Sequence, residues 1–162
     1  MEFFQELRER AKEHIRKADH MLIMTYPLLN EPKILVSVTN NLLKSVEYAM
    51  TAILEYERLF KRIPPFPENN FDSKFFIFRD KIMKRYSLNP DHIKLITSLR
   101  ELVKAHSTSS VEFSRKGQFV ICSNDYELRT LTANDLKKYM SKAKVFIDDM
   151  YRLTQENDGI FR

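Results

Sequence analysis

Glycine is nearly absent from this chain: only Gly117 and Gly159 occur among its 162 residues. Because glycine most easily adopts the backbone conformations of tight turns and bulges, a chain this poor in glycine has few places to turn sharply. It also holds neither a GxGxxG nor a GxxxxGK loop for cradling phosphate groups. The sequence therefore predicts a fold in which helices dominate.

Three long segments carry apolar residues at three- and four-residue spacing, the period of one face of an α-helix. They predict helices over about residues 2–26, ending before Pro27, over residues 35–60, ending before Pro64, and over residues 133–153. Each predicted helix has a single apolar face, which must be buried against another element.

Two shorter helices are predicted between the long ones. The first spans residues 74–86, with Asp72 or Ser73 as its cap. The second runs from residue 90 to His106, with Asn89 as its cap and a proline at its first position.

Residues 111–131 have a different pattern, in which β-branched and aromatic side chains alternate with polar ones. Turn signals stand at Lys116–Gly117 and at Asn124–Asp125. We expect two or three short antiparallel strands here, followed by Thr132 as the cap of the last helix.

These elements predict a mainly α fold: an up-and-down bundle of about five helices with a small β-hairpin insertion near residues 111–131. The chain has the length of one domain, residues 1–162. Because so small a sheet is marginally stable alone, one side of it should pack on the bundle or on a partner subunit. We expect a homodimer, the commonest oligomer.

Composition limits the setting and the chemistry. Cys122 is the only cysteine, so neither an internal disulfide nor a cysteine-based zinc site can form, and a reducing, cytoplasmic location is expected. No apolar run approaches the roughly 20 residues that cross a bilayer, and no apolar secretory segment opens the chain. No metal or other cofactor and no membrane partner is expected, whereas the net charge of +5 suits a partner that carries phosphates.

Arg100 and His106 are the candidate catalytic residues, in the run SLRELVKAHSTS. An arginine can hold a phosphate by two parallel hydrogen bonds, and a histidine can transfer protons near neutral pH. Six residues of α-helix leave the two side chains roughly 120° apart around the axis. They converge only if the helix ends near Ala105 or if a second subunit completes the site.

A structural role is the alternative for both residues. Arg100 would then be a solvated arginine pairing with Glu101 or Glu57, and His106 a partly buried residue bonding backbone carbonyls at the helix end.

The Arg-x5-His spacing resembles the Arg-x4-6-His pattern of the HEPN family, all-helical domains that include many metal-independent ribonucleases. Glu57, Lys61 and Arg62 form Glu-x3-Lys-Arg, which is similar to a polar motif of some HEPN branches. The resemblance covers the helical portion, about two thirds of the chain. It implies a homodimer that builds its RNA site at the subunit interface.

The resemblance also implies roles for the residues. His106 would deprotonate the ribose 2′-OH or protonate the leaving oxygen, and Arg100 would stabilise the charge that builds on phosphorus. Lys104, one turn past Arg100, would steer the RNA backbone.

For the second motif, Lys61 and Arg62 would extend the phosphate-binding surface toward Arg100, with Glu57 holding Arg62 or Arg58 in place. The alternative is an ordinary helix-stabilising pair of Glu57 with Lys61.

Three classes of function follow: a HEPN-like RNA-binding protein, which includes the metal-independent endoribonucleases; a non-enzymatic dimeric scaffold or regulator; and a bundle that binds a small ligand. Only RNA binding should weaken steeply with salt, because phosphate contacts release counterions.

Overall fold

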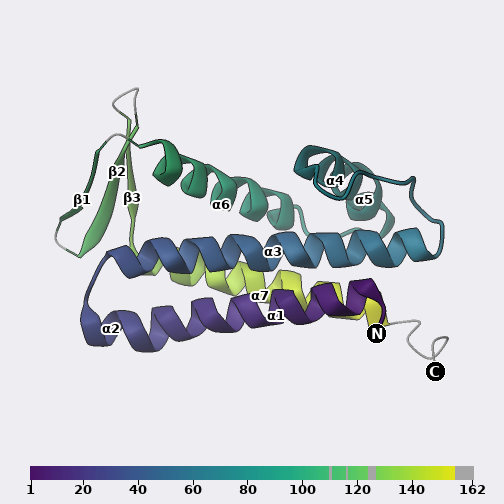
Figure 1. Cartoon of the computed structure of the whole chain (residues 1–162), viewed down its shortest axis with the longest axis horizontal. Coiled ribbons are helices and arrows are strands. Elements are labelled where there is room, and N and C mark those ends of the chain that lie inside the picture. The colour runs from purple at the N-terminus through teal and green to yellow at the C-terminus, as the bar shows by residue number, and fades with distance from the viewer. Residues whose placement is uncertain (110, 116, 124–126, 156–162) are drawn as a thin grey trace.

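The computed structural model describes residues 1–109, 111–115, 117–123 and 127–155. Long helices lie side by side, with two shorter helical segments over one end of α3 and a small sheet at the other (Figure 1). The predicted mainly α fold with a small β insertion is confirmed. The predicted turn residues Lys116, Asn124 and Asp125, and Gly159, lie outside the described residues.

The helices are α1 (Phe3–His20), α2 (Tyr26–Leu29), α3 (Lys33–Leu59), α4 (Phe71–Ile77), α5 (Met83–Arg85), α6 (Asp91–Thr108) and α7 (Ala133–Gln155), and the strands are β1 (Val111–Arg115), β2 (Gln118–Cys122) and β3 (Leu128–Leu131).

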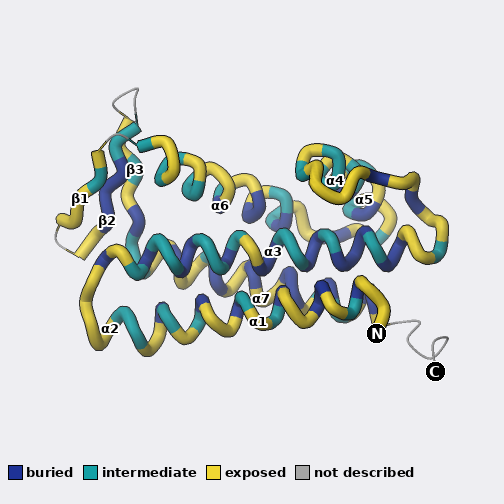
Figure 2. The backbone as a smooth tube through the Cα atoms, viewed as in Figure 1, coloured by how far each residue is buried: buried dark blue, intermediate teal, exposed yellow. Residues whose placement is uncertain are grey.

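The core lies where α1, α3 and α7 meet (Figure 2). The outward faces of α1 and α7 are exposed, whereas α3, which also contacts α4 and α6, is buried or half-buried along most of its length. Small residues let α1 and α3 approach closely: Ala11 and Ala49 are fully buried, and the Ser45 hydroxyl donates a hydrogen bond of 2.9 Å to the carbonyl of Ala11. The apolar stripes of the sequence therefore become the seams between helices.

The first helix does not end before Pro27, contrary to the prediction. A π-helical segment, Met21–Thr25, follows α1, and α2 continues from it directly with Pro27 in its first turn. The wider π turn lets the N–H of Tyr26 bond the carbonyl of Met21, so the backbone is rearranged ahead of the proline. The helix stops at Asn30, which adopts φ 49°.

The helix predicted over residues 74–86 begins three residues earlier, at Phe71. Its cap is Asn70, whose side-chain oxygen accepts a 3.0 Å hydrogen bond from the N–H of Ser73. Asp72 and Ser73 therefore lie inside the first turn instead of capping it. A π-helical segment, Phe78–Ile82, separates α4 from α5.

Helix α6 begins at Asp91, one residue after the predicted start, so Pro90 precedes the first turn instead of opening it. The side-chain oxygen of Asn89 still accepts a 2.9 Å hydrogen bond from the N–H of Asp91. The helix ends two residues later than predicted, at Thr108 instead of His106. Thr132 caps α7 as expected, accepting a 3.1 Å hydrogen bond from the N–H of Asp135.

The three strands are antiparallel in the order β1-β2-β3. Phe119, Ile121 and Leu131 share one face of the sheet and are buried. The opposite face exposes Phe113 and Leu128. As expected for so small a sheet, one side packs against the bundle.

Among the described residues, none of the helices has the length and apolar character needed to span a lipid bilayer.

Candidate functional site

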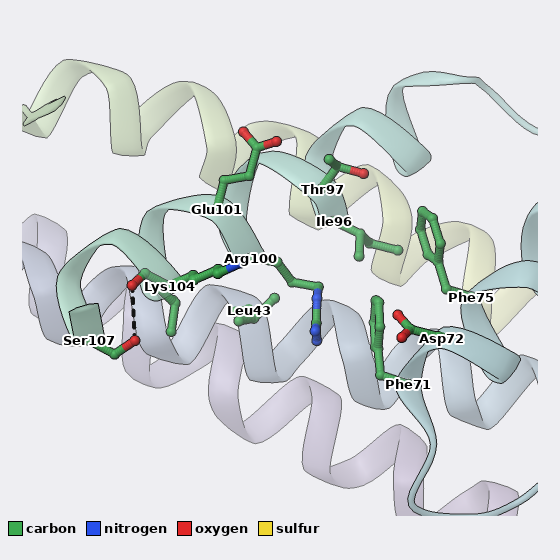
Figure 3. A pocket seen from close by; sticks show the side chains of 11 residues that line it. Leu43, Phe71, Asp72, Phe75, Ile96, Thr97, Arg100, Glu101, Lys104 and Ser107 are labelled. Atoms are coloured by element: carbon green, nitrogen blue, oxygen red, sulfur yellow. Dashed lines mark hydrogen bonds between the residues drawn. The ribbon is translucent and has the colours of Figure 1, made fainter. Parts of the chain in front are cut away.

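A cleft of about 480 Å³ lies between α3, α4 and α6 (Figure 3). Helix α6 contributes Arg100, Glu101 and Lys104, and α4 contributes Phe71 and Phe75. Cations and aromatic rings thus line one space, although they come from separate segments of the chain.

Two contacts fix the side chain of Arg100 in this cleft. Its Nη1 lies 2.9 Å from Oε1 of Glu47 on α3, and its Cζ lies 3.5 Å from the centroid of the Phe71 ring. Because 3.5 Å is the contact distance of two carbon atoms, the guanidinium must lie face-on over the ring. Arg100 therefore pairs with a carboxylate, as the structural alternative expected, but with Glu47 instead of Glu101 or Glu57. Its side chain is still 42% exposed, so a ligand can reach it.

Lys104 supplies the uncompensated positive charge of the cleft. It is exposed, and no carboxylate of the described residues lies within ion-pair distance of its Nζ. By contrast, Glu101 is 3.7 Å from Arg129, so its negative charge is partly balanced. Asp72 also lines the cleft, which therefore holds charges of both signs.

His106 points away from the cleft and toward the sheet. Its Nδ1 lies 2.8 Å from Oε1 of Glu112 on β1, and its ring meets Phe119 edge-on at 6.3 Å between centroids. The Ser109 hydroxyl also donates a hydrogen bond to Glu112. A carboxylate, instead of the backbone carbonyls that the structural alternative named, thus lies beside this histidine. Among the described residues Nδ1 nevertheless has no hydrogen-bond partner, so Glu112 is close to the ring without forming a hydrogen bond of regular geometry.

Arg100 and His106 do not meet within one chain. Because α6 continues past Ala105 to Thr108, the roughly 120° between their directions persists. Arg100 faces α3 and α4, whereas His106 faces β1 and β2. For Arg100 to act beside His106, the Arg100 side chain would have to come from a second subunit.

Glu57 is fully buried and joins the end of α3 to α5. Its Oε2 accepts a 3.0 Å hydrogen bond from Arg85, its Oε1 lies 3.6 Å from Arg62, and the Tyr86 hydroxyl donates to it. Burial raises the pKa of the Tyr86 hydroxyl, and its hydrogen bond to Glu57 raises that pKa further. Glu57 therefore holds Arg62, as one hypothesis required, but is itself inaccessible to RNA.

Lys61 ends α3 through its backbone. It adopts φ 57°, its N–H bonds the carbonyl of Arg58 at 2.9 Å, and the next N–H, of Arg62, bonds the carbonyl of Glu57 at 3.0 Å. This is the Schellman arrangement, in which glycine usually occupies the left-handed position. No ion pair joins Glu57 to Lys61 among the described residues.

The two basic regions are separate. Helices α3 and α6 are neighbours, as the hypothesis of one extended surface required. However, Glu47, the partner of Arg100, lies nearly three turns of helix before Glu57, about 15 Å along α3.

Sequence reasoning missed two residues that matter for this geometry. Phe71 precedes the helix predicted over residues 74–86, and nothing near it in the sequence signals its contact with Arg100. His92 is 2% exposed, with Nε2 2.7 Å from Oδ2 of Asp149 on α7. Because His92 is buried, we assign this pair to the packing of α6 on α7.

The fold and the cleft define a small helical-bundle protein with a cation and aromatic groups in one surface cleft. Comparison with protein-family models, with curated proteins and with solved structures finds no match for this chain. No group of three or more metal-ligating side chains occurs in the part of the chain that the structure describes.

Proposed function

We propose that this protein binds RNA through the cleft between α3, α4 and α6. The observation that carries the proposal is the arginine fixed face-on over Phe71, one helical turn from the exposed Lys104. Proteins bind unpaired RNA by combining cations for the phosphates with flat groups for the bases. The net charge of +5 and the resemblance to the HEPN family support the same function.

Lys61 and Arg62 form a second basic region in this proposal. Arg62 is 36% exposed and is held by Glu57, and Lys61 is exposed. An RNA that leaves the cleft along α3 would meet these side chains with its phosphates.

Fluorescence anisotropy with a labelled single-stranded RNA tests the proposal. We expect binding that weakens with salt and a Lys104→Ala variant with lower affinity and a smaller salt dependence, by about 0.7 in the logarithmic slope. Lys142→Ala is the matched control, because Lys142 is exposed on α7 and does not line the cleft. Absence of salt-dependent binding, or equal loss in both variants, would contradict the proposal.

Cleavage of RNA without metal is the second function we propose, and the pairing of His106 with Glu112 favours it. A carboxylate lies 2.8 Å from Nδ1, and 36% of the histidine side chain stays exposed. His106 would then move the 2′-OH proton or protonate the leaving oxygen, while Arg100 of a second subunit stabilises the charge on phosphorus. Incubation with RNA in EDTA tests this function.

A homodimer is part of this proposal. The outward face of the sheet exposes Val111 (53%), Phe113 (42%) and Leu128 (66%), although such faces are usually polar. A second copy packed on this face would cover these side chains. The exposed apolar face of the sheet also favours the alternative function, a dimeric scaffold without enzymatic activity. Light scattering tests the dimer, and the cleavage assay separates a dimeric ribonuclease from a dimeric scaffold. The single cysteine supports a cytoplasmic location.

A further inference from the structure

Three planar groups are stacked in the cleft. The ring of Phe75 lies 5.4 Å from that of Phe71 with 19° between their planes, and the guanidinium of Arg100 covers the other side of Phe71 (Figure 3). The stack therefore ends at the guanidinium of Arg100.

The free end of this stack faces the cleft. Beyond the guanidinium lie Leu43 and, farther along α6, Lys104 and Ser107 (Figure 3). The Arg100 side chain is 42% exposed and lines the cleft, so a ligand in the cleft can contact the guanidinium on the side away from Phe71. Leu43 offers an apolar floor beside it, so the space suits a flat, partly apolar ring.

The partners of Arg100 favour stacking over phosphate binding. Glu47 already occupies an N–H donor of the guanidinium and compensates its charge. A phosphate would compete with that carboxylate for the remaining donors in the plane, whereas a base needs only the open face. Since Glu47 and Phe71 hold the guanidinium in place before any ligand arrives, stacking costs little conformational entropy.

We propose that Arg100 is a stacking platform for an unpaired nucleobase, and that Lys104 receives the phosphate of that nucleotide. The RNA ligand is then single-stranded, because a base paired in a duplex has both faces covered by its neighbours and cannot enter the cleft. This inference rests on the proposed RNA-binding function and changes the role of Arg100 from a phosphate clamp to a base-stacking residue.

A free mononucleotide offers the same chemistry, a planar base and a phosphate. We assign the site to a nucleotide within an RNA strand, because Lys104 and Arg62 lie in separate basic regions and only a ligand of several nucleotides has phosphates that reach both. The experiment therefore includes a mononucleotide.

Anisotropy is measured with a labelled single-stranded RNA, with the same strand annealed to its complement, and with AMP as competitor. We expect the duplex to bind at least about tenfold more weakly and AMP to compete only at far higher concentrations than the unlabelled strand. If AMP competes at the same concentration as the unlabelled strand, the site binds free mononucleotides, and its assignment to a nucleotide within an RNA strand is wrong.

Arg100→Lys keeps the charge and removes the planar face, so affinity for the single strand should fall at least about fivefold. Phe71→Leu, which removes the support beneath the guanidinium, should lower it in the same direction. Arg79→Lys is the matched control, since Arg79 lies 5.6 Å from the Phe76 centroid, outside the cleft. Melting temperatures of all variants show that each is folded.

The outcomes separate the two proposals. If RNA binds in a salt-dependent way but Arg100→Lys equals the wild type, or the duplex binds as well as the single strand, the stacking role is overturned and RNA binding stands. If no RNA binds, both proposals fail.

Discussion

Arg100 lies face-on over Phe71, with 3.5 Å between Cζ and the ring centroid, and this contact joins α6 to the start of α4. Phe71 thereby covers one face of the guanidinium, while 42% of the Arg100 side chain stays exposed beside the cleft. An arginine that the sequence assigns to phosphate chemistry is thus held as part of an aromatic stack.

Replacement of Lys61 by glycine should stabilise the protein. Lys61 adopts φ 57°, where a Cβ atom is strained, so Lys61→Gly should raise the free energy of unfolding by about 0.5–1 kcal/mol in urea denaturation. Lys142→Gly, within the right-handed helix α7, is the control and should lower it by about 1 kcal/mol. A destabilised Lys61→Gly protein would contradict the capping role of Lys61.

Loss of the charge on Glu57 should destabilise the end of α3. Glu57→Gln removes the charge that pairs with the partly exposed Arg62 and Arg85 and changes the hydrogen bonds of a fully buried group, at a cost of about 1–3 kcal/mol. Glu13→Gln removes a surface pair with Lys17 and should cost less than about 0.5 kcal/mol. Thermal unfolding followed by circular dichroism compares the stability of the two variants. Similar losses of stability would contradict a stabilising role for the pairs of Glu57 with Arg62 and Arg85.

Tyr86 should ionise late in an alkaline titration. Its pKa is raised above 10.0 by burial and by the hydrogen bond to Glu57. A group with a raised folded-state pKa favours folding fully below its unfolded pKa, and this contribution is lost as the pH rises through the folded pKa. The stability contribution of Tyr86 should therefore fall only above about pH 10.

Ultraviolet absorbance of tyrosinate measures this titration. Tyr86→Phe should remove one of the late-ionising groups and leave that of Tyr151, whose pKa is also raised by burial. An unchanged late phase in Tyr86→Phe would show that the hydroxyl of Tyr86 ionises normally.

Cleavage of single-stranded RNA in EDTA should depend on His106. Loss of its proton transfer in His106→Ala should lower the cleavage rate by at least about a hundredfold with RNA binding retained. Glu112→Gln should lower the rate less, because Glu112 lies beside the ring and transfers no proton to the RNA. His20→Ala, an exposed histidine of α1, is the control. Cleavage that is absent from the wild type, or equal in His106→Ala, would leave RNA binding as the function.

A charge at Phe113 should disrupt the proposed dimer. Phe113 is 42% exposed on the outward face of the sheet, so Phe113→Glu should shift the mass measured by light scattering from dimer to monomer. Phe76→Glu changes an exposed phenylalanine of α4, away from the sheet, and should leave the mass unchanged. A wild-type monomer at high concentration would contradict the dimer itself.

The sequence by itself determined the helices, the strands and several of their ends. Apolar spacing and the caps Asn89 and Thr132 act through residues a few positions apart, so they can be recognised without the fold. The prediction that the first helix ends before Pro27 was wrong, because a π turn rearranges the backbone ahead of the proline. A π turn has no sequence signal of its own.

The tertiary structure alone decided the candidate site. The angle between Arg100 and His106 followed from helix geometry, but their partners, Glu47, Phe71 and Glu112, come from three other elements. Which side chains meet across helices depends on how the helices pack and rotate against each other, and apolar periodicity fixes only which face of each helix is buried. For this reason the sequence could place an arginine on α6, while only the fold could show that a ring covers one of its faces.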